Sequence, residues 1–317
     1  MMTTASRHPI VDRASWLAMR KRDVTASAAA ALFGDGVHPY LTAYQLFALK
    51  AGLVEEDSAE SPAMRRGRLL EPVALQLLRE ERPDWKINAN TDYFRDDAAR
   101  IGATPDACAW RPDIEGNGAV QIKTVGHFAF KKGWRGETGD VEIPLWIAVQ
   151  ASVEAALTGS SWACVAAMSL GDGGLDLHIE EVPLRPALMA RLRILTADFW
   201  RRVEANEPYP ADFNRDAALI AKLFQDDDGS EIDLSRSNRV VELVALRETL
   251  KARESDGNFA EKERKIVDAE IIAALGNAAR GRLADGRVIE AKTVRRGAYE
   301  VKATTYRQIK VREGKTA

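Results

Sequence analysis

The sequence has few cysteines, since Cys108 and Cys164 are the only two in 317 residues. They do not form a CxxC pair, so one chain cannot supply the four thiolates of a structural zinc site or of an iron–sulfur cluster. This content does not suggest a disulfide framework and is typical of a protein from a reducing cytoplasm.

Long apolar runs are also missing. The first residues, MMTTASRHPIVDR, contain no apolar segment of a signal peptide. No later run reaches the roughly 18 apolar residues that a membrane-spanning helix needs. We therefore expect a soluble protein that works in the cytoplasm and has no membrane partner.

Neither sign of charge dominates. The 45 lysines and arginines nearly balance the 47 aspartates and glutamates, and the net charge is −2. A nucleic-acid partner would therefore have to be bound by local basic patches. Hydrophobic residues make up 46% and charged residues 29%, as in a globular protein of one large or two modest domains.

Patterns along the chain predict a disordered tail at 1–10, a main α/β domain at 11–210 and an appendage at 211–317. For the main domain, periodicity and capping residues predict helices at 15–20, 25–33, 42–52, 62–81, 144–157 and 185–207. Alternating runs predict strands at 86–94, 101–104, 106–110, 119–125, 162–170 and 175–182, with the GDGG run at 171–174 as a hairpin turn.

The appendage begins with an acidic loop at 226–233. Two helices are predicted at 238–254 and 259–275, followed by a β-hairpin around Asp285-Gly286 and another strand. The segment from Arg280 to Lys315 is strongly basic. It is a candidate for a second phosphate-binding surface or for a surface that binds a partner protein.

The run TPDACAWRPDIEGNGAVQIKTV, residues 104–125, suggests a reactive site. Gln121 and Lys123 are two residues apart and share one face of a strand, whereas Ile122 points into the core with its backbone carbonyl at the site. Together with Asp106, these oxygen donors suit Mg²⁺ or Mn²⁺. A lysine beside such a cation can hold or deprotonate water, which favours phosphodiester hydrolysis. An aspartate and a lysine at this spacing also occur on ordinary solvent-facing strands.

Two predicted helices carry further polar candidates. Glu71 lies in GRLLEP, near the middle of the helix at 62–81, just before the first predicted strands. Gln150 interrupts the apolar run WIAVQASVEAAL, where an amide either serves the site or is a hydrogen-bonded core residue.

The order of these segments resembles the phage lambda exonuclease and YqaJ viral recombinase family, within the PD-(D/E)xK nucleases. The similarity covers about residues 12–210 and is carried by WLAMRKRDVTAS (16–27), GRLLEP (67–72), GATPDA (102–107), QIKTV (121–125) and IPLWIAVQASVEAALTG (143–159). It implies an α/β (α+β) fold with a restriction-endonuclease-like core, in which helices flank a central mixed β-sheet. The helical pair and basic β-hairpin of the appendage resemble longer members more loosely.

The resemblance also implies roles for individual residues. Asp106 would be the central ligand of one or two Mg²⁺ or Mn²⁺ ions, with Glu71, Gln121 and the carbonyl of Ile122 as further ligands. Lys123 would position or activate the attacking water, and Gln150 would orient Lys123 or contact the DNA backbone.

DNA contacts follow from the same resemblance and from local charge. Arg20 would hold a DNA 5′-phosphate, together with the hydroxyls of Ser27 and Thr25. Ser27 could instead cap the helix that follows it. The segment after the core strand is a candidate for backbone contacts, with Trp134 stacking on a base or packed onto the protein; its candidate residues are Lys131, Lys132, Trp134 and Arg135.

Position 121 departs from the family pattern, because it carries Gln where Glu is usual. The site would then hold two anionic side chains, Asp106 and Glu71, instead of three, which predicts weaker binding of one metal ion. Glu115, in the preceding loop, is a more distant candidate for a substitute carboxylate.

The leading hypothesis is a Mg²⁺-dependent 5′→3′ double-strand DNA exonuclease of phage or prophage recombination, in a bacterial host cytoplasm. It would digest one strand from a 5′-phosphorylated end and pass the 3′ strand to a single-strand annealing protein, and the resemblance implies a ring-shaped homotrimer. The alternatives are an endonuclease of the same superfamily and a DNA-binding or assembly module whose chemistry Gln121 impairs.

Overall fold

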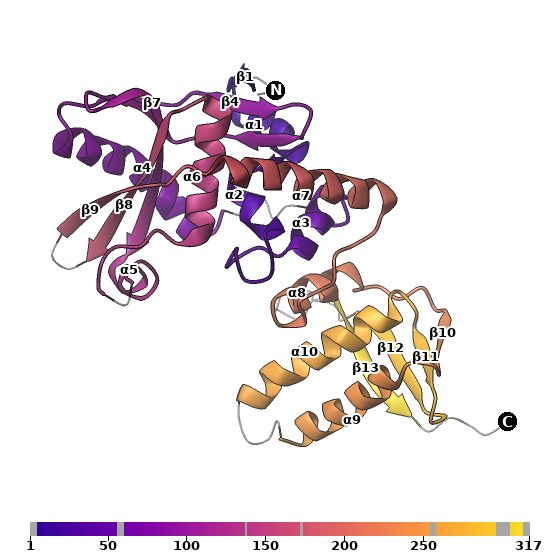
Figure 1. Ribbon diagram of the computed structural model, residues 1–317. Helices are drawn as coiled ribbons and strands as arrows, with labels where there is room; N and C mark the ends of the chain where they lie inside the picture. Colours follow the sequence, from indigo (N-terminus) through magenta and orange to yellow (C-terminus); the bar gives the residue numbers. More distant parts are fainter. Residues whose placement is uncertain are drawn as a thin grey trace. The chain divides into compact units, whose positions relative to one another are not determined.

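The computed structural model describes residues 5–55, 60–136, 138–171, 174–253, 258–295 and 305–312. The chain divides into two compact units, residues 1–208 and 209–317, and each is considered by itself. Both units combine sheets and helices, as Figure 1 shows. No helix within the described residues is long and apolar enough to cross a membrane.

A mixed five-stranded sheet forms the centre of the first unit. Strands β7 and β8 run parallel, and every other neighbouring pair is antiparallel. In sheet order, the strands are β3 (Lys86–Ala89), β6 (Ala107–Arg111), β7 (Ile114–Gly126), β8 (Trp162–Gly171) and β9 (Gly174–Glu181). The central mixed sheet flanked by helices that the sequence predicted is confirmed.

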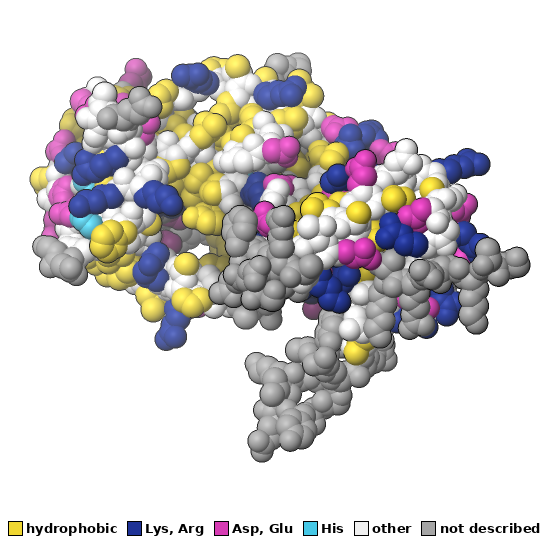
Figure 2. Space-filling model, turned by 90° about the horizontal axis from the view of Figure 1, so that it is seen from below, with side chains coloured by type: hydrophobic (Ala, Val, Ile, Leu, Met, Phe, Trp, Pro, Cys, Tyr) yellow, Lys and Arg dark blue, Asp and Glu magenta, His cyan; other side chains and the backbone are white. Residues whose placement is uncertain are grey.

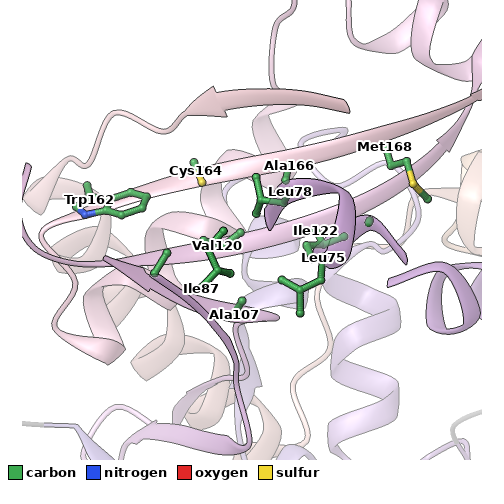
Figure 3. Packing of buried hydrophobic residues seen from close by; sticks show 12 residues of the cluster. Leu75, Leu78, Ile87, Ala107, Val120, Ile122, Trp162, Cys164, Ala166 and Met168 are labelled. Atoms are coloured by element: carbon green, nitrogen blue, oxygen red, sulfur yellow. The ribbon is translucent and has the colours of Figure 1, made fainter. Parts of the chain in front are cut away.

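Helices cover both faces of this sheet. On one face, α4 (Pro62–Glu81) packs Leu75 and Leu78 against Val120 and Ile122 of β7, as Figure 3 shows. On the other face, α5 (His127–Gly133) and α6 (Leu145–Thr158) pack against the alternate residues of β7 and β8. Because side chains alternate along β7, Gln121 and Lys123 are directed to the α6 face.

A second sheet of the first unit has the order β1-β4-β5-β2. Its strands are β1 (Ser6–Pro9), β4 (Asp92–Asp96), β5 (Ile101–Ala103) and β2 (Val24–Thr25). The remaining helices of the unit are α1 (Arg13–Lys21), α2 (Ala26–Ala29), the 3₁₀ helix η1 (Ala30–Leu32), α3 (Ala43–Lys50) and α7 (Pro186–Ala205). One buried cluster joins α2, β5, α6 and α7, so α6 contributes to the cores beneath both sheets.

Two sequence predictions in this unit are wrong. Residues 6–9, expected within a disordered tail, form strand β1, because they pair with β4 and Ser6 donates a 2.6 Å hydrogen bond to Asp97. The strand expected at 86–94 is two strands in different sheets. Asn90 separates them, since its side chain accepts from the backbone nitrogen of Asp92 and donates to its carbonyl oxygen.

The second unit contains a four-stranded sheet and three helices within its described residues. The strands in sheet order are β10 (Glu231–Leu234), β11 (Arg280–Leu283), β12 (Val288–Arg295) and β13 (Thr305–Arg312). The helices are α8 (Phe213–Leu223), α9 (Asn238–Arg253) and α10 (Asn258–Leu275). The predicted hairpin is present between β11 and β12, with Gly286 at a φ of 84° that favours glycine.

Two features of the second unit differ from expectation. Part of the predicted acidic loop is strand β10, which pairs in parallel with β11 and buries Leu234. Helix α8, which the sequence analysis did not predict, begins after Asp212, whose carboxylate accepts a hydrogen bond from the backbone nitrogen of Asn214. The centre of the GDGG turn and the end of the basic segment lie outside the described residues, at 172–173 and 313–315.

Candidate active site

Asp106 is held at the start of β6 by the neighbouring strand. Its Oδ2 atom accepts a 2.6 Å hydrogen bond from the backbone nitrogen of Ile122 and a second from the side-chain amide of Gln121. Ala107 pairs with Val120, so the antiparallel register of β6 and β7 brings these residues together. The expected meeting of the TPD and QIK segments is therefore present in the structure.

Gln150 connects β7 to α6. Its Oε1 atom accepts a 3.0 Å hydrogen bond from Nζ of Lys123. Its Nε2 atom donates to Oε1 of Gln121 at 2.6 Å and to Oε1 of Glu154 at 2.9 Å. Gln150 is buried but every polar atom of its amide has a partner, so it orients the lysine through a direct contact.

The Gln121 amide has its nitrogen, rather than its oxygen, towards the predicted metal ligands. Nε2 of Gln121 donates to Asp106 and, at 3.1 Å, to the carbonyl oxygen of Ile122. Its Oε1 accepts from Gln150. In this arrangement Gln121 orients the two oxygen donors, and a role as an oxygen ligand would require its amide to turn over.

Glu71 approaches the same region from α4. Gly67, one turn earlier, faces Thr124 of β7, since a Cβ atom at Gly67 would lie 4.0 Å from the Thr124 hydroxyl oxygen. Glu71 is exposed on the surface of α4. Even so, the protein around it raises the pKa of its carboxyl group, and the positive charge of Lys123 opposes that rise.

Two carboxyl groups of the site, those of Asp106 and Glu154, have raised pKa values. The pKa of Asp106 is raised to about 7, chiefly by burial and also by the nearby Glu71 charge, although Lys123 and the two hydrogen bonds to Asp106 oppose the rise. Burial also raises the pKa of Glu154 well above its ordinary value, and Asp106 contributes to that rise. A bound cation would lower these raised pKa values by favouring the charged carboxylates, so the site favours cation binding.

The donor atoms present suit a hard divalent cation. Asp106 and Glu71 offer carboxylate oxygens and Ile122 offers a carbonyl oxygen, the donor type that Mg²⁺ and Mn²⁺ prefer. Among the described residues, no group of three His, Cys, Asp or Glu side chains is arranged to hold a metal ion. A cation bound here would thus have at most two carboxylate ligands and would keep several waters, as Mg²⁺ commonly does.

The candidate phosphate pocket lies on α1, β2 and α2. The guanidinium carbon of Arg20 lies 4.5 Å from the centre of the Trp16 ring. Trp16 donates a 3.1 Å hydrogen bond to the hydroxyl of Thr104, two residues before Asp106. Arg20 is therefore linked to the loop that carries Asp106, through an aromatic residue that the sequence analysis did not single out.

The two hydroxyls of this pocket lie close together. The Oγ1 atom of Thr25 is 3.1 Å from the Oγ atom of Ser27. Helix α2 begins at Ala26 and its N-cap is Thr25, so the alternative in which Ser27 caps the helix is wrong. Ser27 lies inside the first turn, which leaves its hydroxyl free of a capping role.

The segment 131–135 forms the end of α5 and the residues after it. Lys131, Lys132 and Arg135 are exposed. Trp134 is buried, with 5% of its surface exposed, and stacks on Phe130 at 5.7 Å between ring centres. The prediction that Trp134 stacks on a base is wrong, and the alternative of an aromatic packed onto the protein is confirmed.

On the face shown in Figure 2, basic side chains lie among acidic and hydrophobic side chains, in keeping with the net charge of −2. Phe128, at the start of α5, is an aromatic residue that remains 87% exposed.

Two residues near the site were missed. Trp146 and Glu154 lie four residues before and after Gln150, so all three share one face of α6. The Trp146 ring lies 5.5 Å from Nζ of Lys123 and packs against His38 and Tyr40. A glutamate on an otherwise apolar helix, one turn from a candidate residue, was the signal for Glu154.

Comparisons with known proteins found a family and several solved structures to which the chain is similar. The family model of the YqaJ-like viral recombinase domain matches residues 15–161. No curated protein sequence matches the chain.

Three solved structures are among those to which the chain is similar. The alkaline exonuclease LHK-Exo from Laribacter hongkongensis is 23% identical over 66% of this chain and 100% of its own, with a TM-score of 0.45. LHK-Exo in complex with dAMP is 24% identical over 66% of this chain and 100% of its own, with a TM-score of 0.46. The KSHV SOX RNA complex is 11% identical over 62% of this chain and 71% of its own, with a TM-score of 0.36.

The matched segment begins just before Trp16 and ends beyond α6. It therefore contains Arg20, Glu71, Asp106, Lys123 and Gln150, the residues on which the resemblance was based. Residues 15–161 of this protein thus match the YqaJ-like viral recombinase domain, and this match supports a nuclease.

Proposed function

We propose that this protein is a divalent-metal-dependent exonuclease that digests one strand of duplex DNA from a 5′-phosphorylated end and leaves a 3′ single strand. One observation supports this proposal most directly. Asp106 is hydrogen-bonded to Ile122 and Lys123 to Gln150, and Gln121 links the two pairs where β6, β7 and α6 meet.

Asp106, the carbonyl of Ile122 and Glu71 are the donors that would hold Mg²⁺ or Mn²⁺, as one ion or two. When bound, such a cation would polarise a phosphate oxygen and make a bound water more acidic. Gln121 keeps Asp106 oriented by donating to its Oδ2 atom. The chain thus supplies both the oxygen donors and the hydrogen bonds that fix their direction.

Lys123 is the candidate for positioning the attacking water. Its ammonium donates to Gln150 and faces the Trp146 ring, so few other directions remain for its other two N–H groups. One can hold a water or a phosphate oxygen. The positive charge would also offset the negative charge that develops on the phosphate during hydrolysis.

End recognition is assigned to the pocket of Arg20, Thr25 and Ser27. A guanidinium supported by an indole ring keeps its planar fork of donors in place for a terminal phosphate. The two adjacent hydroxyls could add further hydrogen bonds. The exposed Lys131, Lys132 and Arg135 are suited to backbone phosphates of the bound strand.

A partner and an oligomeric state follow from the family resemblance and belong to the proposal. The partner is a single-strand annealing protein that receives the 3′ strand. The oligomeric state is a ring-shaped homotrimer, which would keep the enzyme on its duplex. The trimer is tested by light scattering of the full chain, where a mass near three times 34.9 kDa is expected and a monomer mass contradicts it.

The activity is tested on linear duplexes with 5′-phosphate or 5′-hydroxyl ends and on a closed circle, with and without Mg²⁺. We expect metal-dependent loss of the linear duplex, faster with the phosphate, and an intact circle. Asp106→Ala and Lys123→Ala should abolish digestion. Lys265→Ala, which removes an exposed lysine paired with Glu261, should not change it.

The other outcomes distinguish the alternatives. Cutting of the closed circle would indicate an endonuclease. DNA binding without cleavage at any metal concentration would indicate an assembly module whose chemistry is impaired at position 121.

A further inference from the structure

Glu154 is a buried acidic residue for which the proposed mechanism has no role. It lies on α6, one turn after Gln150, and only 1% of its surface is exposed. Its Oε1 atom accepts a 2.9 Å hydrogen bond from Gln150, whereas its Oε2 atom has no hydrogen-bond partner among the described residues. Burial of a carboxyl group with one unpaired oxygen is costly, so a compensating function is expected.

Glu154 determines which way the Gln150 amide faces. Lys123 on one side requires an oxygen, and Glu154 on the other side requires an N–H group. If the amide turned over, its NH₂ group would meet the ammonium and its oxygen would meet the carboxylate. The two charged residues therefore fix Gln150 in one orientation.

The orientation of Gln150 then fixes that of Gln121. The Nε2 atom of Gln150 needs an acceptor, and Oε1 of Gln121 supplies it at 2.6 Å. The Gln121 NH₂ group is thereby directed to Asp106 and to the Ile122 carbonyl, the two candidate metal ligands. A chain of hydrogen bonds thus runs from Glu154 to the donors of the site.

We propose that Glu154 is a positioning residue of this site, which orients Gln150 and Gln121 and, once a divalent cation is bound, supplies the negative charge that Gln121 does not carry. The inference rests on the proposed metal-dependent function and deepens it. Glu154 would not itself bind the cation, because no three acidic side chains among the described residues are arranged to hold a metal ion. It would act on the ligands through Gln150 and Gln121. Burial raises the pKa of Glu154, and a bound cation would oppose that rise, so cation binding and the charged form of Glu154 favour each other.

The test is the affinity of the full chain for Mn²⁺ without DNA, measured from the electron paramagnetic resonance signal of free Mn²⁺. Glu154→Gln keeps an acceptor for Gln150 and removes only the charge. We expect its Mn²⁺ affinity to fall about tenfold, at the lower end of the range for residues behind metal ligands. Glu154→Leu also removes the acceptor for Gln150. It should lower kcat below that of Glu154→Gln, with the KM for DNA unchanged.

A charge returned at position 121 should rescue the site. The double variant Q121E/E154Q is expected to regain most of the lost Mn²⁺ affinity, which a purely structural role of Glu154 would not predict. Glu81→Gln is the matched control, because Glu81 is an exposed carboxylate at the end of α4. Its Mn²⁺ affinity should equal that of the unaltered protein.

Unchanged Mn²⁺ affinity in E154Q would overturn the inference, whatever the nuclease activity. If the unaltered protein binds Mn²⁺ but does not digest DNA, the proposed function fails, while a weaker affinity of E154Q still supports the inference. If E154Q does not fold, E154L takes its place. An Mn²⁺ affinity of E154L equal to that of the unaltered protein would also overturn the inference.

Discussion

Nζ of Lys123 and Oε1 of Gln150 lie 3.0 Å apart and form the hydrogen bond that joins β7 to α6 at the site. If Gln150 acts by orienting Lys123, the two residues form one functional unit. Gln150→Ala should then lower kcat by about 10- to 100-fold, and Lys123→Ala by more. The double variant should be no slower than Lys123→Ala alone, because effects within one unit are not additive.

Initial rates at saturating linear duplex measure this relationship. Rate losses that multiply in the double variant would show that Gln150 acts separately from Lys123, for example on the DNA backbone.

The raised pKa of Asp106 predicts a pH dependence of stability in metal-free protein. The carboxyl group has an ordinary pKa of 3.8 and a pKa of about 7 in the folded chain. Folding therefore disfavours its charged form, and the resulting loss of stability grows between these two values and is complete above the higher one. Asp106→Asn removes this loss, so its melting temperature should exceed that of the unaltered protein by more at about pH 8 than at about pH 5.

Thermal melts in EDTA at the two pH values check this expectation. A difference between the two proteins that does not change with pH would contradict it. Adding Mn²⁺ should stabilise the unaltered protein more than the variant, because binding to the folded state raises stability.

Gly102, in the GATPDA segment, is required by packing. A Cβ atom there would lie 1.7 Å from the hydroxyl oxygen of Tyr93, which is fully buried and donates a 2.9 Å hydrogen bond to Asp23. Gly102→Ala should lower the free energy of unfolding by about 3 kcal/mol, as overpacking does, or prevent folding. Gly133→Ala, where a Cβ atom meets nothing within 4 Å, is the control in urea unfolding.

Trp134 and Phe128 should behave in opposite ways. Trp134 is buried on Phe130, so Trp134→Ala is expected to cost about 3 kcal/mol of stability. Phe128 is exposed, and Phe128→Ala should change stability by less than about 0.5 kcal/mol. Unfolding curves of both variants decide this, and equal losses would contradict the burial described above.

The exposed lysines of α5 are expected to bind DNA through charge. Lys131→Glu combined with Lys132→Glu should weaken binding of every duplex sequence alike and reduce the dependence of binding on salt. Fluorescence anisotropy over a salt series measures both effects. Unchanged affinity at low salt would exclude these lysines from the interface.

Much of the fold could be predicted because local signals were strong. Helix α4 begins at Pro62 after Ser61, whose hydroxyl accepts from the backbone nitrogen of Met64, and the helix follows the predicted range. Strand β1 could not be predicted in this way. It depends on pairing with β4, some 85 residues away in sequence, and no local pattern reports a distant partner.

For the site, too, local relationships could be predicted from the sequence and relationships that depend on tertiary packing could not. A period of two on β7 was enough to place Gln121 and Lys123 on one face, since that relationship is local. The direction of the Gln121 amide and the part played by Glu154 depend on how α6 lies against β7. The direction in which an amide group faces depends on tertiary packing, and the spacing of residues in the sequence does not report it.

Strand β1 has a practical consequence for anyone who shortens the protein. It covers one edge of β4, and Arg7 forms an ion pair with the largely buried Asp92. A chain trimmed to begin at Val11 would leave a row of unpaired backbone groups on β4 and a buried carboxylate without its cation. Exposed strand edges recruit other chains, so the shortened protein is expected to self-associate in a way that could be mistaken for native assembly.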